Sequence, residues 1–177
     1  MARFANEAPP AQIVAAVRIL KRTKPLNATV AMSGVIGPRG GHLWIPEAGV
    51  EVRFAPGAVV SATRITLTAI EGTDVAYEFM PHGLKFSAPV VVRQDLKKTT
   101  AGSDAGLAAS LQGSYFEGAL AANLLGTHDV YARIKEGRQG KLNANSRSLE
   151  FTIEHFSGYM VSTALVAVDI LGDWAAR

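Results

Sequence analysis

Short stretches in which apolar and polar residues alternate dominate the chain from Thr29 onward. In the stretch 64–71, Ile65, Leu67 and Ala69 alternate with polar residues, which predicts a strand with one buried and one solvated face. Comparable runs, rich in β-branched and aromatic residues, lie at 30–36, 43–45, 50–54, 77–80, 84–86, 90–96, 113–116, 130–134 and 149–154. Short strands with glycine and proline turns between them are typical of a sandwich or barrel. We predict an all-β fold, an antiparallel β-sandwich.

The first 27 residues have a different pattern. Ile13, Val14, Val17 and Leu20 recur at helical spacing, and Pro25 ends the segment because proline lacks an amide donor. We predict a short N-terminal helix or extended segment within a lead-in of residues 1–27. The sandwich then occupies residues 28–168, and 169–177 form a C-terminal tail, either a helical turn or a segment that docks Trp174.

Two polar segments interrupt the strand pattern. Residues 97–106 are small and rich in glycine, serine and threonine, whereas residues 136–148 are polar and basic. Both compositions are typical of solvent-exposed loops, and we predict loops at these positions. The apolar run 159–168 that follows predicts a last core strand.

Composition and charge narrow the function classes. The 177 residues are 48% hydrophobic and 19% charged, the balance of one globular domain. The net charge is +3, and lysines and arginines are scattered over three segments without forming a stripe. Nucleic-acid binders of the stacking type interleave basic residues with exposed aromatics, so we predict no nucleic-acid partner.

The chain contains no cysteine, which excludes disulfides, thiolate metal sites and a cysteine nucleophile but leaves the compartment open. No apolar run approaches the roughly 20 residues of a membrane-spanning helix. Glu7 and two prolines stand where a signal peptide would have its apolar region. We predict a soluble chain without membrane insertion or signal peptide; an exported or cell-surface location stays open if the start is truncated.

Several catalytic and ligand-binding motifs are absent. The four histidines form neither an HxH nor an HExxH spacing, and we predict no metal and no cofactor. The glycine-rich run 37–41 lacks the spacing and the Lys-Ser/Thr ending of a phosphate-binding loop, so turn geometry explains it. The GxSxG motif of many hydrolases does not occur.

The densest chemistry lies in the stretch 149–163, at His155, Phe156 and Ser157. A hydroxyl and an imidazole two residues apart point to the same face of a strand. If a bend brought them closer, Ser157 could attack the carbonyl of Phe156 with His155 moving the proton. That N-to-O acyl shift requires strain in the peptide bond. The alternative is a packed corner with Phe156 in the core and both polar side chains hydrogen-bonded.

Three segments of the sequence resemble the ZU-five domain, the β-sandwich module of ankyrins, zonula occludens proteins and uncoordinated-type netrin receptors. They are GPRGGHLWIPEAGVEVRFAPGAV at 37–59, PHGLKFSAPVVV at 81–92 and IEHFSGYMV at 153–161. The resemblance covers about residues 33 to 165. The chain is similar to stand-alone bacterial versions of the module.

The resemblance implies a non-enzymatic protein-interaction or structural module, with a partner that the sequence does not identify. Some members of that family cleave themselves between Phe and Ser of a His-Phe-Ser motif. Carried over, this implies autoproteolysis at Phe156–Ser157 with Ser157 as nucleophile and His155 as its helper, as the alternative function. Self-cleaving members tend to continue with bulky aromatics, whereas Gly158 follows here. The oligomeric state stays open.

Overall fold

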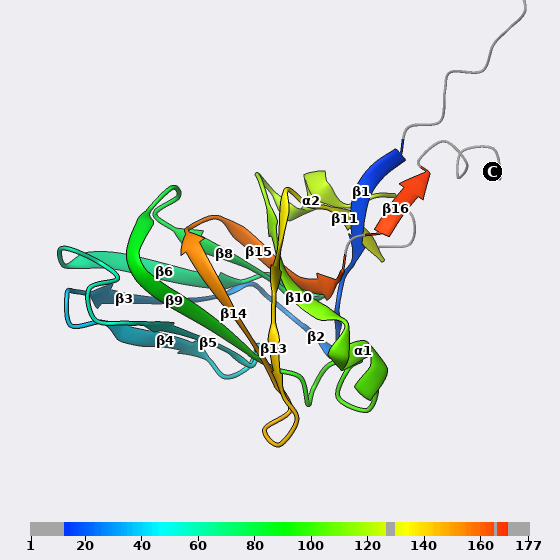
Figure 1. Cartoon of the computed structure of the whole chain (residues 1–177), viewed down its shortest axis with the longest axis horizontal. Coiled ribbons are helices and arrows are strands. Elements are labelled where there is room, and N and C mark those ends of the chain that lie inside the picture. Colours follow the sequence, from blue (N-terminus) through cyan, green and yellow to red (C-terminus); the bar gives the residue numbers. More distant parts are fainter. Residues whose placement is uncertain (1–12, 127–129, 165, 170–177) are drawn as a thin grey trace, which may run out of the picture.

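Two antiparallel sheets pack face to face in the computed structural model, which describes residues 13–126, 130–164 and 166–169. The six-stranded sheet has the order β12 (Glu136–Gln139), β10 (Leu111–Phe116), β15 (Gly158–Thr163), β8 (Ala76–Met80), β6 (Thr63–Ala69) and β3 (Val30–Ile36). The five-stranded sheet has the order β13 (Lys141–Asn143), β14 (Ser148–His155), β9 (Lys85–Asp95), β5 (Val50–Phe54) and β4 (Gly41–Ile45). This arrangement confirms the predicted all-β sandwich (Figure 1).

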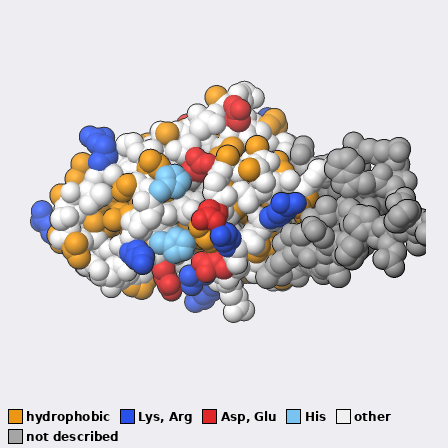
Figure 2. All heavy atoms as spheres, turned by 90° about the horizontal axis from the view of Figure 1, so that it is seen from above, with side chains coloured by type: hydrophobic (Ala, Val, Ile, Leu, Met, Phe, Trp, Pro, Cys, Tyr) orange, Lys and Arg blue, Asp and Glu red, His pale blue; other side chains and the backbone are white. Residues whose placement is uncertain are grey.

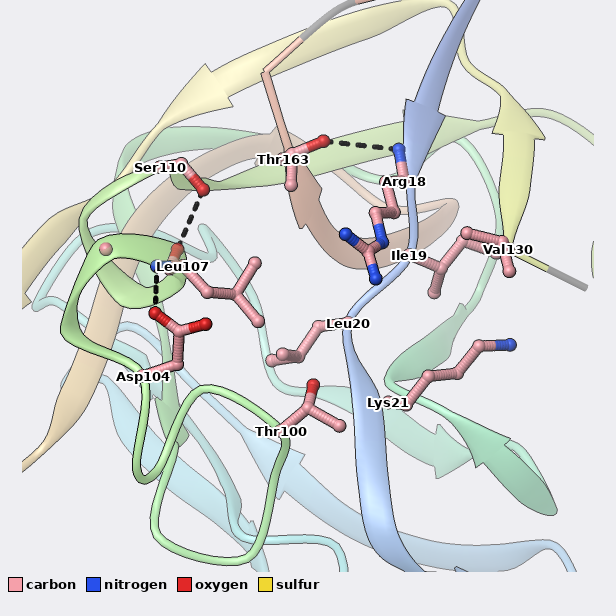
Figure 3. A pocket seen from close by; sticks show the side chains of 11 residues that line it. Arg18, Ile19, Leu20, Lys21, Thr100, Asp104, Leu107, Ser110, Val130 and Thr163 are labelled. Atoms are coloured by element: carbon pink, nitrogen blue, oxygen red, sulfur yellow. Dashed lines mark hydrogen bonds between the residues drawn. The ribbon is translucent and has the colours of Figure 1, made fainter.

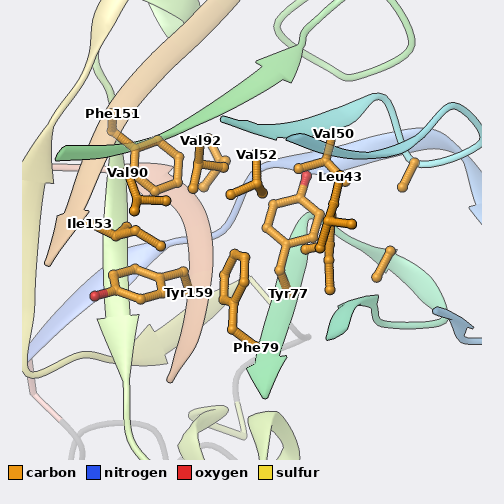
Figure 4. Close-up of a cluster of buried hydrophobic side chains, with 14 of the residues drawn as sticks. Leu43, Val50, Val52, Tyr77, Phe79, Val90, Val92, Phe151, Ile153 and Tyr159 are labelled. Atoms are coloured by element: carbon orange, nitrogen blue, oxygen red, sulfur yellow. The ribbon is translucent and has the colours of Figure 1, made fainter. Parts of the chain in front are cut away.

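The alternation along each strand places one apolar face of each sheet in a shared core. On β6, Ile65, Leu67 and Ala69 are buried, and on β5 Val50 and Val52 are buried. Figure 4 shows aromatic side chains of the six-stranded sheet meeting aliphatic side chains of the five-stranded sheet. Burial of each large side chain contributes about 1.5–3 kcal/mol, so this shared core is the main source of stability.

Two smaller sheets and two short helices complete the fold. A three-stranded sheet has the order β11 (Tyr131–Arg133), β1 (Ile13–Arg18) and β16 (Val166–Asp169), and β2 (Lys21–Leu26) pairs with β7 (Gly72–Asp74). The helices are α1 (Ala105–Ala109) and α2 (Leu120–Asn123). Val17 and Ile19 pack on Phe116 and Met160 in a second apolar cluster. The three-stranded sheet therefore covers part of the outer face of the six-stranded sheet.

The N-terminal segment is the extended alternative, and the helical one is not formed. Residues 13–18 form β1, which pairs with both β16 and β11. The β-branched residues Ile13, Val14 and Val17 favour a strand, and pairing on both edges outweighs the helical spacing. Residues 1–12 and 170–177, including the predicted docking of Trp174, lie outside the described residues.

The loop predictions for 136–148 and 97–106 need correction. Strands β12 and β13 lie within 136–143 and are short edge strands. The side chains of β12 alternate between half-buried and exposed, and those of β13 are all exposed. In the other segment, Thr99 and Ala101 are buried and α1 begins at Ala105. The predicted strands 84–86 and 90–96 are one continuous strand, β9.

Candidate functional site

His155, Phe156 and Ser157, the corner motif, lie where the chain passes from one large sheet to the other. β14 ends at His155 in the five-stranded sheet, and β15 begins at Gly158 in the six-stranded sheet. The chain bends at Ser157. The Phe156 amide donates a hydrogen bond to the Leu84 carbonyl at 2.9 Å. The motif is thus a corner held by the turn that precedes β9.

The Phe156 side chain is an anchor of the shared core. It is almost fully buried, and its ring stacks on Phe79 with centroids 5.1 Å apart. Phe86 and Phe54 meet it edge to face at 4.8 Å and 6.2 Å. Both arrangements are favourable for aromatic rings. The middle residue of the motif therefore has a packing role whatever its neighbours do.

The peptide bond between Phe156 and Ser157 has one feature relevant to acyl transfer. The Gly83 amide donates to the Phe156 carbonyl oxygen at 3.1 Å, and this oxygen would carry the negative charge if a nucleophile attacked. Neither Phe156 nor Ser157 has a positive φ. Ser157 is only 8% exposed, and no hydrogen bond between these two described residues joins its hydroxyl to the His155 ring.

The His155 imidazole contacts side chains from other strands. Its Nε2 is 3.7 Å from Oε1 of Glu136 on β12. The ring of Tyr115 on β10 meets the imidazole edge to face, with centroids 5.0 Å apart. A carboxylate beside a histidine nitrogen favours one ring orientation and tautomer. Glu136 and Tyr115 thus extend the site beyond the motif.

Arg138 links the carboxylates around His155. Its guanidinium donates to Glu136 at 3.1 Å and to Glu154 at 3.3 Å. Partial burial lowers the pKa of Arg138, but the charges of Glu136 and Glu154 outweigh it and raise the pKa overall. Figure 2 shows histidines among acidic and basic side chains on the face seen from above. These contacts make the site a mixed-charge surface in which Arg138 stays protonated.

Tyr159 is a buried residue that contacts the corner motif from the side of the core. Its hydroxyl donates to the His155 carbonyl at 3.3 Å. Burial raises the pKa of Tyr159, and the negative charge of Glu136 raises it further. The neutral hydroxyl therefore acts as a donor that helps to hold the main chain at the corner.

Gly158 is required by close packing rather than by a special backbone conformation. It does not have a positive φ. A Cβ at this position would lie 2.4 Å from Cε2 of Phe116, far inside van der Waals contact. The fold therefore needs the small size of Gly158 and not its backbone freedom.

The sequence did not indicate Glu136, Tyr115 or Gly83 as neighbours of the motif. Glu136 fell in a segment predicted as a loop, and Tyr115 belonged to a predicted core strand. The pairing of β10 with β12 and β15 brings Glu136 and Tyr115 to the corner. Gly83 reaches it through its hydrogen bond to Phe156. No short-range sequence signal marks such a contact.

A separate hollow of about 520 Å³ lies beside β1, β2 and α1 (Figure 3). Arg18 and Thr100 point into it, but its other polar groups serve local structure. Asp104 accepts from the Leu107 amide at 2.9 Å, and the Ser110 hydroxyl donates to the Leu107 carbonyl at 2.7 Å. Both contacts cap α1, so the hollow has no converging set of unpaired groups.

Within the described ranges, no group of three or more His, Asp or Glu side chains could hold a metal ion. His128 lies outside these residues. No helix in the described part of the chain is long and apolar enough to cross a membrane. No known protein family matches the chain, and comparison with curated proteins finds no match.

Proposed function

We propose that the chain is a non-enzymatic protein-interaction or structural module that associates through the free edge of β3. The observation that carries this proposal is the composition of that edge. β3 ends the six-stranded sheet, and Val30–Ile36 contains neither a charged residue nor a proline. Natural edge strands are normally protected by charge, proline or a covering segment. An unprotected edge suits strand addition by a partner.

The side chains around this edge also suit association. Val35 and Met32 on β3 are 63% and 42% exposed, and Trp44 on β4 is 55% exposed. β4 is the edge of the other sheet and follows β3 through a tight turn. Exposed tryptophan and methionine are enriched in protein interfaces. We name the two adjacent strands β3 and β4 the open edge.

A charged ladder borders the open edge on the outer face of the five-stranded sheet. Arg93 lies 4.0 Å from Glu51 and 3.9 Å from Glu150, and Arg53 pairs with Glu150. Each exposed pair contributes at most about 1 kcal/mol to stability. The ladder therefore serves mainly to keep this face solvated, and it gives the apolar edge the polar rim typical of interfaces.

The test compares two lysine substitutions at exposed valines. Val35→Lys places a charge on β3, whereas Val60→Lys places one in the loop between β5 and β6, where Val60 is 77% exposed. We expect wild type and Val60→Lys to retain the same associations, with other proteins or with copies of the chain. Val35→Lys should lose them. Proximity labelling in the native host measures these associations, and binding of the chain to each partner found is then repeated with the purified proteins.

Unchanged associations in Val35→Lys would refute the open edge as the interaction surface. The non-enzymatic role would be refuted if the purified protein hydrolysed or transferred a small substrate and a substitution in a hollow away from His155 abolished that activity. Unfolding curves of both lysine variants serve as the control for folding.

Self-cleavage is the second candidate, favoured by the Gly83 amide at the Phe156 carbonyl. In this reaction the Ser157 hydroxyl oxygen attacks the Phe156 carbonyl carbon. The bond to the Ser157 nitrogen breaks, and that nitrogen takes up the hydroxyl proton through His155. Water then hydrolyses the ester, leaving a Phe156 carboxylate and a free Ser157. Resemblance to the ZU-five domain supports the same bond.

Intact-mass spectrometry under denaturing conditions tests cleavage. Cutting before Ser157 releases residues 157–177, and 177 − 157 + 1 gives 21 residues. We expect Ser157→Ala to abolish the fragment, whereas Ser103→Ala, in an exposed loop, should leave it unchanged. A single full-length mass after prolonged incubation would exclude this candidate.

A further inference from the structure

The β3 sequence is complementary to itself when two copies run antiparallel. Suppose that Ser33 pairs with Ser33 of a second copy. Each of the remaining pairs then joins either a large and a small apolar residue or two β-branched residues. From the centre outward the pairs are Met32 with Gly34, Ala31 with Val35, and Val30 with Ile36. Because directly opposed residues share a face, we propose that β3 pairs with β3 of a second copy across a two-fold axis at Ser33. This proposal rests on the proposed function and names the partner.

The outer face of the sheet shows what this pairing would cover. Ser33 and Val35 lie opposite Thr66 and Arg64 of β6, and the Ser33 hydroxyl is 2.7 Å from that of Thr66. Pairing would place the exposed Val35 against Ala31 of the second copy and the two Ser33 hydroxyls beside one another. The most exposed apolar side chain of β3 thereby leaves water.

The inner face is complementary in the same way. Met32 lies opposite the buried Leu67, and Gly34 lies opposite the buried Ile65, so both belong to the core side of the sheet. Cδ2 of Leu43 lies 2.8 Å from where a Cβ of Gly34 would be. Met32 of the second copy would therefore lie beside Gly34 and reach Leu43. The half-exposed Met32 would extend the core across the interface.

Charge disfavours the pairing of β3 with the two polar edge strands, β12 and β13. The opposite edge of the six-stranded sheet is β12, which carries Glu136 and Arg138. The outer edge of the five-stranded sheet, β13, begins with Lys141. Charged edges resist strand addition, so addition of β3 to β12 of another copy, which would propagate into a filament, is disfavoured. A β3–β3 contact is isologous and closes as a dimer.

Main-chain hydrogen bonding adds to this contact. Pairing seven residues forms about six to eight main-chain hydrogen bonds and joins two six-stranded sheets into one continuous sheet. Among the described strands, only β6 is hydrogen-bonded to β3 within a sheet. Trp44 lies on the adjacent edge strand β4, where the five-stranded sheets of the two copies would approach one another.

Single cysteines test the register directly because the chain has no native cysteine. At the proposed axis, the two Ser33 Cα atoms would lie about 4.5–5.5 Å apart, within the range that a disulfide spans. Under mild oxidation we expect Ser33→Cys to form a covalent dimer at least about tenfold faster than Val60→Cys. A mixture of Ala31→Cys and Val35→Cys should cross-link between the two variants more than either variant with itself.

Sedimentation of the full chain supplies the non-covalent readout. Wild type should sediment as a dimer, twice the 18.7 kDa of one chain. Ser33→Lys places two ammonium groups opposite each other, and we expect it to raise the dimer dissociation constant at least about tenfold. Val60→Lys should leave the dimer unchanged. Near-native unfolding midpoints would show that both variants fold.

A monomeric wild type at the highest concentration reached, or equal cross-linking of Ser33→Cys and Val60→Cys, would overturn the dimer. In that case Val35→Lys could still lose its association with a different protein. The proposed interaction function would then stand, and only the second copy would be rejected as the partner. A dimer insensitive to Ser33→Lys would also refute this register.

Discussion

Gly158 shows how a single position couples the corner motif to the second apolar cluster. It follows Ser157 at the start of β15 and pairs with Phe116 of β10. The Phe116 ring occupies the volume that a side chain at Gly158 would need. Protein cores are close-packed, so even one methyl group is felt. The corner and the cover provided by β1 are therefore linked through one aromatic ring.

We predict that Gly158→Ala destabilises the protein by about 1–3 kcal/mol, the usual cost of overpacking. The new methyl group must displace Phe116, because it would start 2.4 Å from that ring. Gly126→Ala is the matched control, since Gly126 has no atom within 4 Å of an added Cβ and no positive φ. Urea unfolding of both variants measures the difference. Equal stability of the two would contradict the packing role of Gly158.

At the residue scale, the sequence identified the corner motif but not its surroundings. His155 and Ser157 attract notice because they are two residues apart in the chain, whereas Glu136 and Gly83 come near them only in the fold. The conformation of Gly158 was also beyond prediction. A glycine needed for a bend and one needed for close approach look identical in sequence.

At the level of elements, period-two alternation was a reliable guide where one face is buried. The predicted strands 64–71 and 50–54 correspond to β6 and β5, in which every second residue is buried. It failed for β12 and β13, which are short, polar and at sheet edges. It was ambiguous for β1, whose residues fit helical spacing but pair with β11 and β16. Long-range pairing decides such cases.

The three-stranded sheet covers one of two methionines that lie on the same face of the six-stranded sheet, and this difference can be tested. Met160 on β15 is fully buried under the cover provided by β1, whereas Met80 on β8 is 48% exposed. We predict that Met160→Ala costs about 2–5 kcal/mol. Met80→Ala should stay within about 0.5 kcal/mol of wild type.

Chemical denaturation of the two alanine variants measures this difference. The comparison is internally matched because both substitutions remove the same atoms from strands of one sheet. A small effect at Met160 would mean that the three-stranded sheet does not cover that face in solution. A large effect at Met80 would instead indicate that another segment or a second copy covers it.

For the molecule as a whole, the two ends of the described chain meet. β1 pairs with β16, and β15 lies between β10 and β8 in the six-stranded sheet. A cut at Phe156–Ser157 would therefore leave both β15 and β16 held by the rest of the molecule. Native sizing would not reveal such a cut, which is why the cleavage test is made under denaturing conditions.

The all-β class could be predicted because turn residues and alternation act locally. The arrangement of the sheets could not be predicted in the same way. Arg22 is an example: its Nη1 donates to the carbonyls of Ile70 and Gly72 at 3.2 Å and to that of Asp74. Its sequence context reads as part of a basic surface tail, yet Arg22 is buried. The carbonyl groups that Arg22 binds lie about 50 residues further along the sequence, so its own sequence context does not indicate them.

Two tyrosines with raised pKa values make the stability of the fold depend on alkaline pH. Burial raises the pKa of Tyr77, with Arg22 offsetting part of the effect, and burial also raises the pKa of Tyr159. In the unfolded chain both hydroxyls ionise near pH 10. Above that pH the unfolded state loses protons that the folded state keeps, so stability is present below about pH 10 and falls as the pH rises.

We predict that Tyr77→Phe flattens this alkaline decline and changes stability little at neutral pH. Its buried hydroxyl interacts electrostatically with Arg22 but has no well-formed hydrogen bond to the described residues, so its removal forfeits little at neutral pH. One tyrosine contributes a slope of at most about 1.4 kcal/mol per pH unit. Urea unfolding between about pH 9 and pH 11 measures the slope, with Tyr131→Phe as the control at a half-buried tyrosine. If Tyr77→Phe kept the wild-type slope, ionisation of Tyr77 would not be what limits folding at high pH.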